Sequence, residues 1–436
     1  MATAVPIALL AIGGIAAVAI VVFVLRLMPR AAFVVWACVL FFVPLWVGVN
    51  VGFYWAAITL LTVVLILVNW SVVPLRAADA WVAVFVVIVV GLYGFGTVDL
   101  PSLVAALLEW VIPYIWGRVV LARVAPEWVT STIAVVAIVA AALAIVEFVT
   151  SFNPFVLIPG SGVVYETWSP LQERGGVLRA EGAWGHSIAL GAALAMSSAF
   201  VVATKWRLFP KISGVVLIAV ATVFTFSRAG LLTLVLTLVL STFLIVGVST
   251  RFRVTVAVAG VIGAAIAIPV IDSVFGAAGD EAGGSADYRT DLLVLLEQVQ
   301  LFGNPGDWHS LVSGDYYLGY FARSVDNALV LTLLRYGYVP TLLIMAAVVC
   351  AALMAVRRST RSPAALAVVG QLPSLVVVAL ITQYSMFLWF CVGLAITWAR
   401  DAGRRESEAD DALFQEAGRT AFAGPRHGAV PQARQT

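Results

Sequence analysis

The chain has 436 residues, of which 62% are hydrophobic and only 11% are charged, and its mean hydropathy is +1.05. Soluble globular domains carry about 25% charged residues, so this composition excludes an ordinary soluble domain. The formal net charge of +2 is uninformative, because in such a chain the sidedness of the charges matters more than their sum.

Apolar runs recur from one end of the chain to the other. Each has roughly 20 residues, which is the length that a membrane-spanning helix needs. The sequence therefore predicts an all-α polytopic integral membrane protein with about 12 or 13 transmembrane helices. In chain order, the predicted spans are 6–27, 31–48, 52–70, 80–96, 100–121, 128–150, 182–203, 211–226, 229–249, 254–275, 326–356, 363–381 and 384–399.

Basic residues fall in every second connection between these spans. Short connections rich in Lys and Arg stay in the cytoplasm, so the amino terminus is expected outside and the carboxyl terminus inside. This pattern predicts a multi-pass protein of the cytoplasmic (inner) cell membrane. The basic residues of these connections are Arg26, Arg30, Arg76, Arg118, Arg123, Lys205, Arg207, Lys211, Arg251, Arg253, Arg357, Arg358, Arg361, Arg400, Arg404 and Arg405.

Two of the remaining, outward connections are long: 151–181 and 276–325. Loops that exceed what linkage needs often carry function, so both are expected to cover the outer mouth of the helix bundle. Residues 1–400 are expected to form one transmembrane domain, whereas 401–436 has the polar, mixed-charge composition of a disordered cytoplasmic tail.

The second long connection has internal organisation. Its apolar positions between 288 and 299 follow helical spacing, which predicts an amphipathic helix on the membrane surface or over a cavity. Glycine and proline at 303–306 predict a turn after it. Aromatic residues follow the turn; they suit either anchoring at the headgroup level or stacking on sugars.

Six arginines and no lysine lie on the outward side. Arg228 stands between two apolar runs with almost no loop, and Arg335 lies about nine residues inside a predicted span. An ionisable group at that depth costs several kcal/mol unless it is paired or faces a wet cavity. One reading is pairing with the buried acids Glu109 and Glu147. The six arginines are Arg174, Arg179, Arg228, Arg289, Arg323 and Arg335.

The other reading of these arginines is an anion site. A guanidinium is always charged and binds phosphate oxygens with a planar fork of donors. A basic cavity at the outer membrane surface suits a lipid diphosphate, whose chain stays in the bilayer while its head group enters the cavity. A carboxylate-bearing substrate fits the same residues.

Three residues are candidates for acid–base chemistry. Asp326 opens the predicted span that contains Arg335, where it is expected either to take a proton from a hydroxyl or to cap the helix. His309 lies in the second long connection, and His186 lies one turn into the span that follows the first. A single histidine is more often a hydrogen-bonded structural group than a base.

Other kinds of chemistry find no support in the sequence. The three cysteines, Cys38, Cys350 and Cys391, all lie in apolar runs, where core packing is the expected role. Zinc-ligand spacing and a nucleotide-binding glycine fingerprint are both missing from the sequence. We therefore expect no metal, no other cofactor and no nucleic-acid partner.

Four stretches together resemble the O-antigen ligase and polymerase superfamily of bacterial envelope glycosyltransferases. Each is weak alone, but their order is fairly specific, and the resemblance covers residues 30–400. The stretches are RAEGAWGHSIALG (179–191), FTFSRAGLL (224–232), DYRTDLLVLLEQVQLFGNPG (287–306) and DNALVLTLLRYGYVP (326–340).

The resemblance implies a metal-independent, inverting glycosyltransferase. Its donor would be a glycan on a polyprenyl diphosphate, its acceptor the hydroxyl of a glycan or glycolipid, and its site the outer face of the cytoplasmic membrane. By the family's pattern Arg179, Arg228 and Arg289 hold the diphosphate, and Arg174 and Arg335 assist. Ligases of the family commonly have histidine where this chain has Asp326, which favours a polymerase or a divergent relative; His309 is the alternative base.

A secondary transporter of an anionic small molecule is the main alternative from another class. Spans interrupted near Pro44, Pro113 and Pro373 are the sequence feature that favours it. The grouping of the arginines at one face, away from the membrane midplane, favours the transferase.

Overall fold

The computed structural model describes residues 21–160, 162–277, 292–306, 312–313, 316–317 and 325–398. This part of the chain is all-α apart from three two-stranded antiparallel hairpins, which confirms the predicted class. The hairpins are β1–β2 (Gly48–Val51 and Phe53–Ala56), β3–β4 (Glu173–Arg174 and Val177–Leu178) and β5–β6 (Val312–Ser313 and Tyr316–Tyr317).

Helices account for most of the rest. The first half contains α2 (Pro29–Phe42), α3 (Ala57–Val68), α4 (Ala77–Gly94), α5 (Leu100–Val104), the π-helix η1 (Ala105–Val111), α6 (Ile112–Val119), η2 (Val120–Ala122), α7 (Pro126–Thr150), η3 (Pro154–Leu157), α8 (Gly162–Trp168), η4 (Gly182–Trp184) and α9 (Ser187–Ala203). The second half contains α10 (Leu208–Phe224), α11 (Arg228–Leu244), α12 (Thr250–Ala277), η5 (Leu292–Gln298), α14 (Ala328–Tyr336), α15 (Tyr338–Leu353), α16 (Pro363–Gln371), η7 (Leu372–Val376) and a last helix over 382–398.

Several of these helices are long and apolar enough to cross a membrane. Four pass by length and composition, and a fifth passes if the bent pair Val21–Leu27 and Pro29–Phe42 is one span. Such a set indicates a multi-pass membrane protein. The four are Ala77–Gly94, Leu100–Ala122, Pro126–Thr150 and Thr250–Val274.

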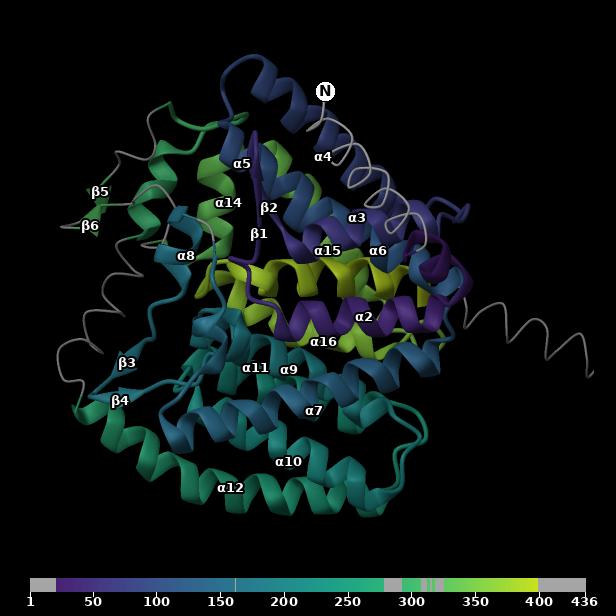
Figure 1. Cartoon of the computed structure of the whole chain (residues 1–436), viewed down its shortest axis with the longest axis vertical. Helices are drawn as coiled ribbons and strands as arrows, with labels where there is room; N and C mark the ends of the chain where they lie inside the picture. The colour runs from purple at the N-terminus through teal and green to yellow at the C-terminus, as the bar shows by residue number, and fades with distance from the viewer. Residues whose placement is uncertain are drawn as a thin grey trace, which may run out of the picture.

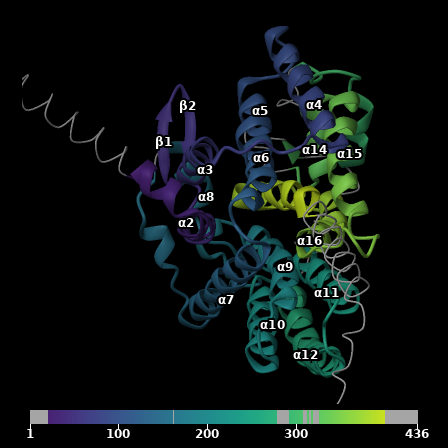
Figure 2. The same cartoon turned by 90° about the vertical axis from the view of Figure 1, so that its right-hand side faces the viewer.

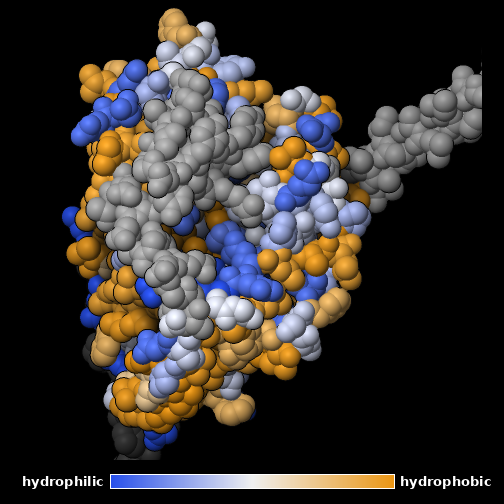
Figure 3. Space-filling view, turned by 90° about the vertical axis from the view of Figure 1, so that its left-hand side faces the viewer, coloured by the Kyte–Doolittle hydropathy of each residue, from blue (hydrophilic) through white to orange (hydrophobic). Residues whose placement is uncertain are grey.

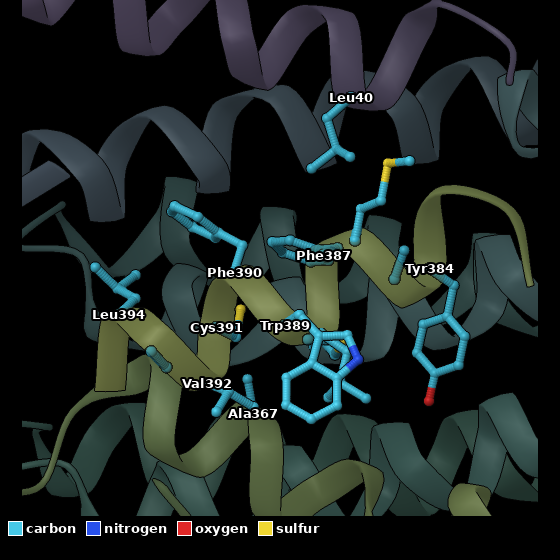
Figure 4. Close-up of a cluster of buried hydrophobic side chains, with 14 of the residues drawn as sticks. Leu40, Ala367, Tyr384, Phe387, Trp389, Phe390, Cys391, Val392 and Leu394 are labelled. Carbon is cyan, nitrogen blue, oxygen red and sulfur yellow. The ribbon is translucent and has the colours of Figure 1, made fainter. Parts of the chain in front are cut away.

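The helices α2, α7, α10 and α12 run in roughly one direction (Figure 1), and α7, α10 and α12 are seen more nearly end-on from the side (Figure 2). The last helix, 382–398, runs through the middle of the bundle, and its residues from Met386 to Ala395 are buried. Its large side chains interlock with those of α2 and α16 (Figure 4). Trp36 and Phe390 pack with ring centroids 4.3 Å apart. This apolar core fixes the positions from which the polar segments extend.

One end of the bundle carries the basic connections. There Arg123 donates from Nη2 to the carbonyl oxygen of Arg26 at 2.7 Å, which joins the α6–α7 connection to the start of α2. Lys205, between α9 and α10, lies 3.6 Å from Glu127 in the first turn of α7. We call this the basic end.

Two further connections belong to the basic end. Arg253 donates from Nε to the carbonyl oxygen of Thr242, near the end of α11. Arg361, between α15 and α16, donates to the carbonyl oxygen of Leu244, the last residue of α11. The grouping of basic connections that the sequence predicted is therefore present in space. Arg118 departs from the expectation, because it is buried within α6 and pairs with Asp79 at 2.7 Å.

Several predicted spans are shorter or broken. The predicted span 326–356 is two helices, α14 and α15, which meet at Gly337. Its φ of +85° would strain any residue with a side chain, and the helix direction changes there. Hydropathy missed this break because both flanking segments are apolar. The predicted span 52–70 begins with strand β2, so its helix starts only at Ala57.

The predicted amphipathic helix at 288–299 is described only from residue 292. It is a 3₁₀-helix, η5, and not the α-helix expected. Leu292 and Leu295 are buried in a small core that includes Val330 and Leu334 of α14. The apolar face of η5 therefore packs against the protein in this region.

Candidate functional site

The turn between α10 and α11 lies at the end of α7 and α11 that is opposite to the basic end. Phe226 has a φ of +45°, an unusual conformation for a residue with a side chain, and turns the chain sharply. Ser227 then caps α11, since its Oγ accepts a hydrogen bond from the Gly230 amide at 3.0 Å. Arg228 is the first residue of α11, and its side chain is exposed.

Two other arginines contact this turn. Arg179 donates from Nε to the carbonyl oxygen of Thr225 at 2.9 Å, and Arg174 donates from Nη1 to the carbonyl oxygen of Phe226 at 3.2 Å. Arg179 is only 5% exposed, whereas Arg174 is half-buried. The structure therefore brings Arg174, Arg179 and Arg228 to one turn, and we call them the arginine cluster.

Close packing of α9 against α11 sets the position of the cluster. Gly191 and Gly230 face each other, and a Cβ built on Gly230 would lie 3.3 Å from the Cα of Gly191. Small residues at such crossings let two membrane helices approach closely. As a result, the segment before α9, in which Arg179 lies, is held against the turn before α11, in which Arg228 lies.

A buried carboxylate fixes the same segment from the other side. Glu147, near the end of α7, accepts hydrogen bonds from the amides of Glu181 at 3.1 Å and Gly182 at 2.8 Å. Asn153 donates to it at 2.9 Å and also to the carbonyl oxygen of Gly182 at 3.0 Å. The sequence offered Glu147 as a partner for a buried arginine, but its described partners are backbone amides and an amide side chain.

His186 has a structural contact in this region. Its Nδ1 accepts a hydrogen bond from the Ile188 amide at 3.2 Å, so it caps the start of α9. The ring packs edge-on against Trp168. This geometry agrees with the structural reading of His186.

The face that carries β3 and β4 is partly hydrophilic. Figure 3 shows it with hydrophilic residues gathered near its middle and hydrophobic surface around them. In Figure 1 the same side also carries α8, whereas the α9–α10 and α11–α12 connections of the basic end lie on the right. The face with β3, the strand that contains Arg174, thus lies at one end of the bundle, and these two basic connections lie at the other.

A second pair of segments meets elsewhere at the break between α14 and α15. The amides of Tyr338 and Val339 donate to the carbonyl oxygens of Gln300 and Leu301 at 2.9 and 3.0 Å, and the Gly303 amide donates to Tyr336. A Cβ on Gly337 would lie 2.8 Å from the Gln300 carbonyl oxygen, so only glycine allows this approach. The described parts of the four stretches singled out in the sequence therefore pair two by two: 179–191 with 224–232, and 292–306 with 326–340.

Arg335 belongs to this second pair of segments. It is close enough to Glu109 of η1 for an electrostatic interaction, and its Nε is buried with no hydrogen-bond partner among the described residues. Glu109 also accepts a hydrogen bond from Ser385 at 3.3 Å. Of the two readings of Arg335, its described neighbours favour charge compensation by a buried acid.

Asp326 lies just before α14. The helix cap is the next residue, Asn327, whose side chain accepts from the Val330 amide at 3.0 Å. The alternative role for Asp326, the cap of this helix, is therefore taken by Asn327. Asp326 is half-buried, and the neighbouring Ala328 amide donates to the carbonyl oxygen of Val378, just beyond η7. Since η7 packs against both α11 and α14, it connects the Asp326 segment to the helix that carries Arg228.

Two predicted site residues, Arg289 and His309, lie outside the described residues, as does Arg323, another of the six outward arginines. The amides and carboxylates that hold the arginine-bearing segment were missed from the sequence. Among them is Gln172, whose amide donates to Glu181 and whose side chain accepts from Ser187. The one sequence feature that could have indicated these contacts is the concentration of polar residues around RAEGAWGH in an otherwise apolar chain.

Comparison with known proteins adds no assignment: no protein-family model and no curated protein matches this chain.

Proposed function

We propose that this chain is a membrane glycosyltransferase of the O-antigen ligase and polymerase type. It transfers a glycan from a polyprenyl diphosphate to an acceptor hydroxyl at the outer face of the cytoplasmic membrane. The proposal includes 12 or 13 spans: besides the long apolar helices, the chain has shorter ones, among them α9, α10, α11 and α15, that extend the bundle.

The observation that carries this proposal is the convergence of Arg174, Arg179 and Arg228 at one turn. The cluster lies opposite the basic end, which the positive-inside rule assigns to the cytoplasm. Each guanidinium carries five N–H donors in a planar fork, a geometry that matches phosphate oxygens. A diphosphate is the ligand for which several forked donors at a membrane surface are best suited.

The chemistry follows from the leaving group. The acceptor oxygen attacks the anomeric carbon, the bond from this carbon to the diphosphate oxygen breaks, and polyprenyl diphosphate leaves with the bonding electrons. Arginines fixed in a water-poor site stabilise the charge that develops on that oxygen. A base, for which Asp326 is our candidate and His309 the alternative, takes the hydroxyl proton. Attack from the opposite face inverts the anomeric configuration.

The fold holds the arginine donors in place before the leaving group departs. Arg179 is held by the Thr225 carbonyl, and its segment is held by Glu147. A donor that is already oriented needs no reorganisation when charge develops. No metal enters this scheme, because the arginines supply the positive charge and the lipid diphosphate supplies a good leaving group.

The test is deletion of the gene followed by analysis of surface polysaccharide. A polymerase predicts single repeat units in place of long chains, and a ligase predicts long chains that remain on the lipid carrier. Reintroducing the gene should restore the glycan, whereas a variant with Arg179 and Arg228 both changed to Gln should not. Unchanged surface glycan in the deletion strain would contradict the proposal.

A secondary transporter of an anionic small molecule remains the second candidate, and one observation favours it. The segment 377–381 between η7 and the last helix is non-helical yet largely buried, and Gln383 after it bonds to the carbonyl oxygens of Val43 and Ala183. Interrupted helices at depth are typical of transporter sites. Loss of anion uptake into proteoliposomes on mutation, with normal surface glycan in the deletion strain, would favour this candidate.

A further inference from the structure

A cavity of about 530 Å³ opens at the basic end, away from the arginine cluster. It lies where the start of α4, the end of α15 and the last helix meet. Its volume is in the range of about 300–1,000 Å³ that is usual for small-molecule sites. The lining residues are Arg76, Ala77, Ala78, Cys350, Leu353, Met354, Val356, Arg357, Thr360 and Ile396.

The charge around this cavity is positive. Arg76, just before α4, and Arg357, in the connection after α15, line it; both are exposed, and the lining residues that the structure describes include no acidic one. The nearest acid along the chain, Asp79, is already paired with Arg118 at 2.7 Å and also accepts a hydrogen bond from Tyr114. Two guanidinium groups therefore bring positive charge to a cavity whose described lining has no acid, which favours an anion.

The rest of the lining is apolar. Leu353, the last residue of α15, is 57% exposed, and Val356, in the connection after it, is 70% exposed. Met354 and Ile396 continue the apolar surface inward. An apolar cleft with two arginines at one side matches a ligand that has an acyl chain and an anionic head.

The position of the cavity identifies the source of such a ligand. Pro74, just before α4, accepts a hydrogen bond from Arg118, and Arg361, just after α15, bonds to the end of α11. The Arg361 contact belongs to the basic end, where the membrane interface of the cytoplasmic leaflet lies in our topology. Basic pockets between transmembrane helices on this side recognise anionic lipid head groups.

We propose that this cavity binds an anionic phospholipid of the cytoplasmic leaflet. The phosphodiester lies between Arg76 and Arg357, and one acyl chain packs along Leu353 and Met354. This site is separate from the arginine cluster, and it does not depend on the proposed transferase activity.

The test is native mass spectrometry of the purified full-length protein with phosphatidylglycerol, and with phosphatidylcholine of the same chains as the zwitterionic probe. We expect preferential retention of phosphatidylglycerol. Arg76→Gln and Arg357→Gln should each weaken its binding about fivefold, and the double variant should weaken it roughly thirtyfold. Leu353→Trp, which keeps the charge but fills the cleft, should also weaken binding.

Arg207→Gln is the matched control. Arg207 is an exposed arginine that precedes α10 at the same end of the bundle, as Arg76 precedes α4, but it does not line the cavity. Its variant should bind phosphatidylglycerol normally. Equal losses for Arg207→Gln and Arg76→Gln would overturn the proposal in favour of general surface attraction. Displacement of the lipid by millimolar glycerol 3-phosphate would overturn it in favour of a site for a free phosphate.

Discussion

Arg179 donates a hydrogen bond from its Nε to the carbonyl oxygen of Thr225 at 2.9 Å, across 46 positions of the sequence. This contact joins the end of the first long connection to the turn between α10 and α11. Because Arg228 follows Thr225 by three residues, the bond ties two arginines of the cluster to the same turn. Their relative position is then set by the α9–α11 packing and does not depend on a flexible loop.

Replacement of Arg228 by Lys tests whether the site needs the guanidinium geometry of this residue or only its positive charge. The ammonium keeps the positive charge but loses the planar fork that binds phosphate oxygens. We expect glycan transfer to fall about 100-fold or more, as is usual when one transition-state donor is removed. The measurement is turnover of the lipid-linked donor by the purified variant. Arg207→Lys at the basic end is the control, and near-normal turnover by Arg228→Lys would remove this residue from the site.

Replacement of Glu147 by Ala should loosen the segment that carries Arg179. The change leaves the buried amides of Glu181 and Gly182 without their acceptor, and each stranded buried donor costs about 1–3 kcal/mol. We expect lower stability in a detergent-denaturation titration and faster hydrogen exchange over residues 179–184. Glu166→Ala is the control, because Glu166 is exposed on the nearby α8. Unchanged exchange in Glu147→Ala would show that this carboxylate does not hold the segment.

The Asp79–Arg118 pair should matter far more for stability than the Lys205–Glu127 pair. In the first pair only 12% of the Asp79 side chain and 7% of the Arg118 side chain are exposed, and removing one partner leaves an uncompensated charge at a cost of about 3–5 kcal/mol. The second has side chains 83% and 44% exposed and is worth about 0–1 kcal/mol. The double variant of Asp79→Leu and Arg118→Met should recover much of the loss. Equal effects of Asp79→Ala and Glu127→Ala on denaturation would contradict this ranking.

The long apolar helices were predictable because hydropathy alone determines them. The run 80–96 became α4 at Ala77–Gly94, and the run 128–150 became α7 at Pro126–Thr150. A hydropathy profile does not predict where one apolar helix ends and a second apolar helix begins in another direction. The break at Gly337 depends on one glycine conformation and on backbone contacts from residues 300–303, which lie far away in the sequence.

The candidate site was predictable in its residue types and less so in its partners. Arg179 and Arg228 were chosen from sidedness and motif order, and the structure places both at the same turn. Glu147 was expected to pair with an arginine, but it accepts hydrogen bonds from backbone amides, because a buried carboxylate accepts from an amide as readily as from a guanidinium. The cap of α14 is Asn327, and not Asp326, the candidate from the sequence. The partner of a buried carboxylate depends on which segment folds over it, and local sequence does not specify that.

Sidedness is tested directly by cysteine labelling with an impermeant maleimide. In a background without the three native cysteines, Glu173→Cys in β3 should react in intact cells, whereas Lys205→Cys should react only after permeabilisation. Both positions are exposed, so accessibility alone does not distinguish them. The reverse pattern would place the arginine cluster in the cytoplasm and remove the outward site.

Asp326 and Asn327 are neighbours with different expected roles, which makes them a matched pair. Asn327→Ala removes the side-chain acceptor for the Val330 amide, so we expect a stability loss of about 0.5–2 kcal/mol with turnover largely kept. Asp326→Asn keeps the shape but removes the base, so we expect lost turnover with the lipid-linked donor still bound. Parallel measurements of donor binding, turnover and denaturation separate the two effects. If Asp326→Asn turns over normally, the base lies elsewhere, and His309 is the next residue to change.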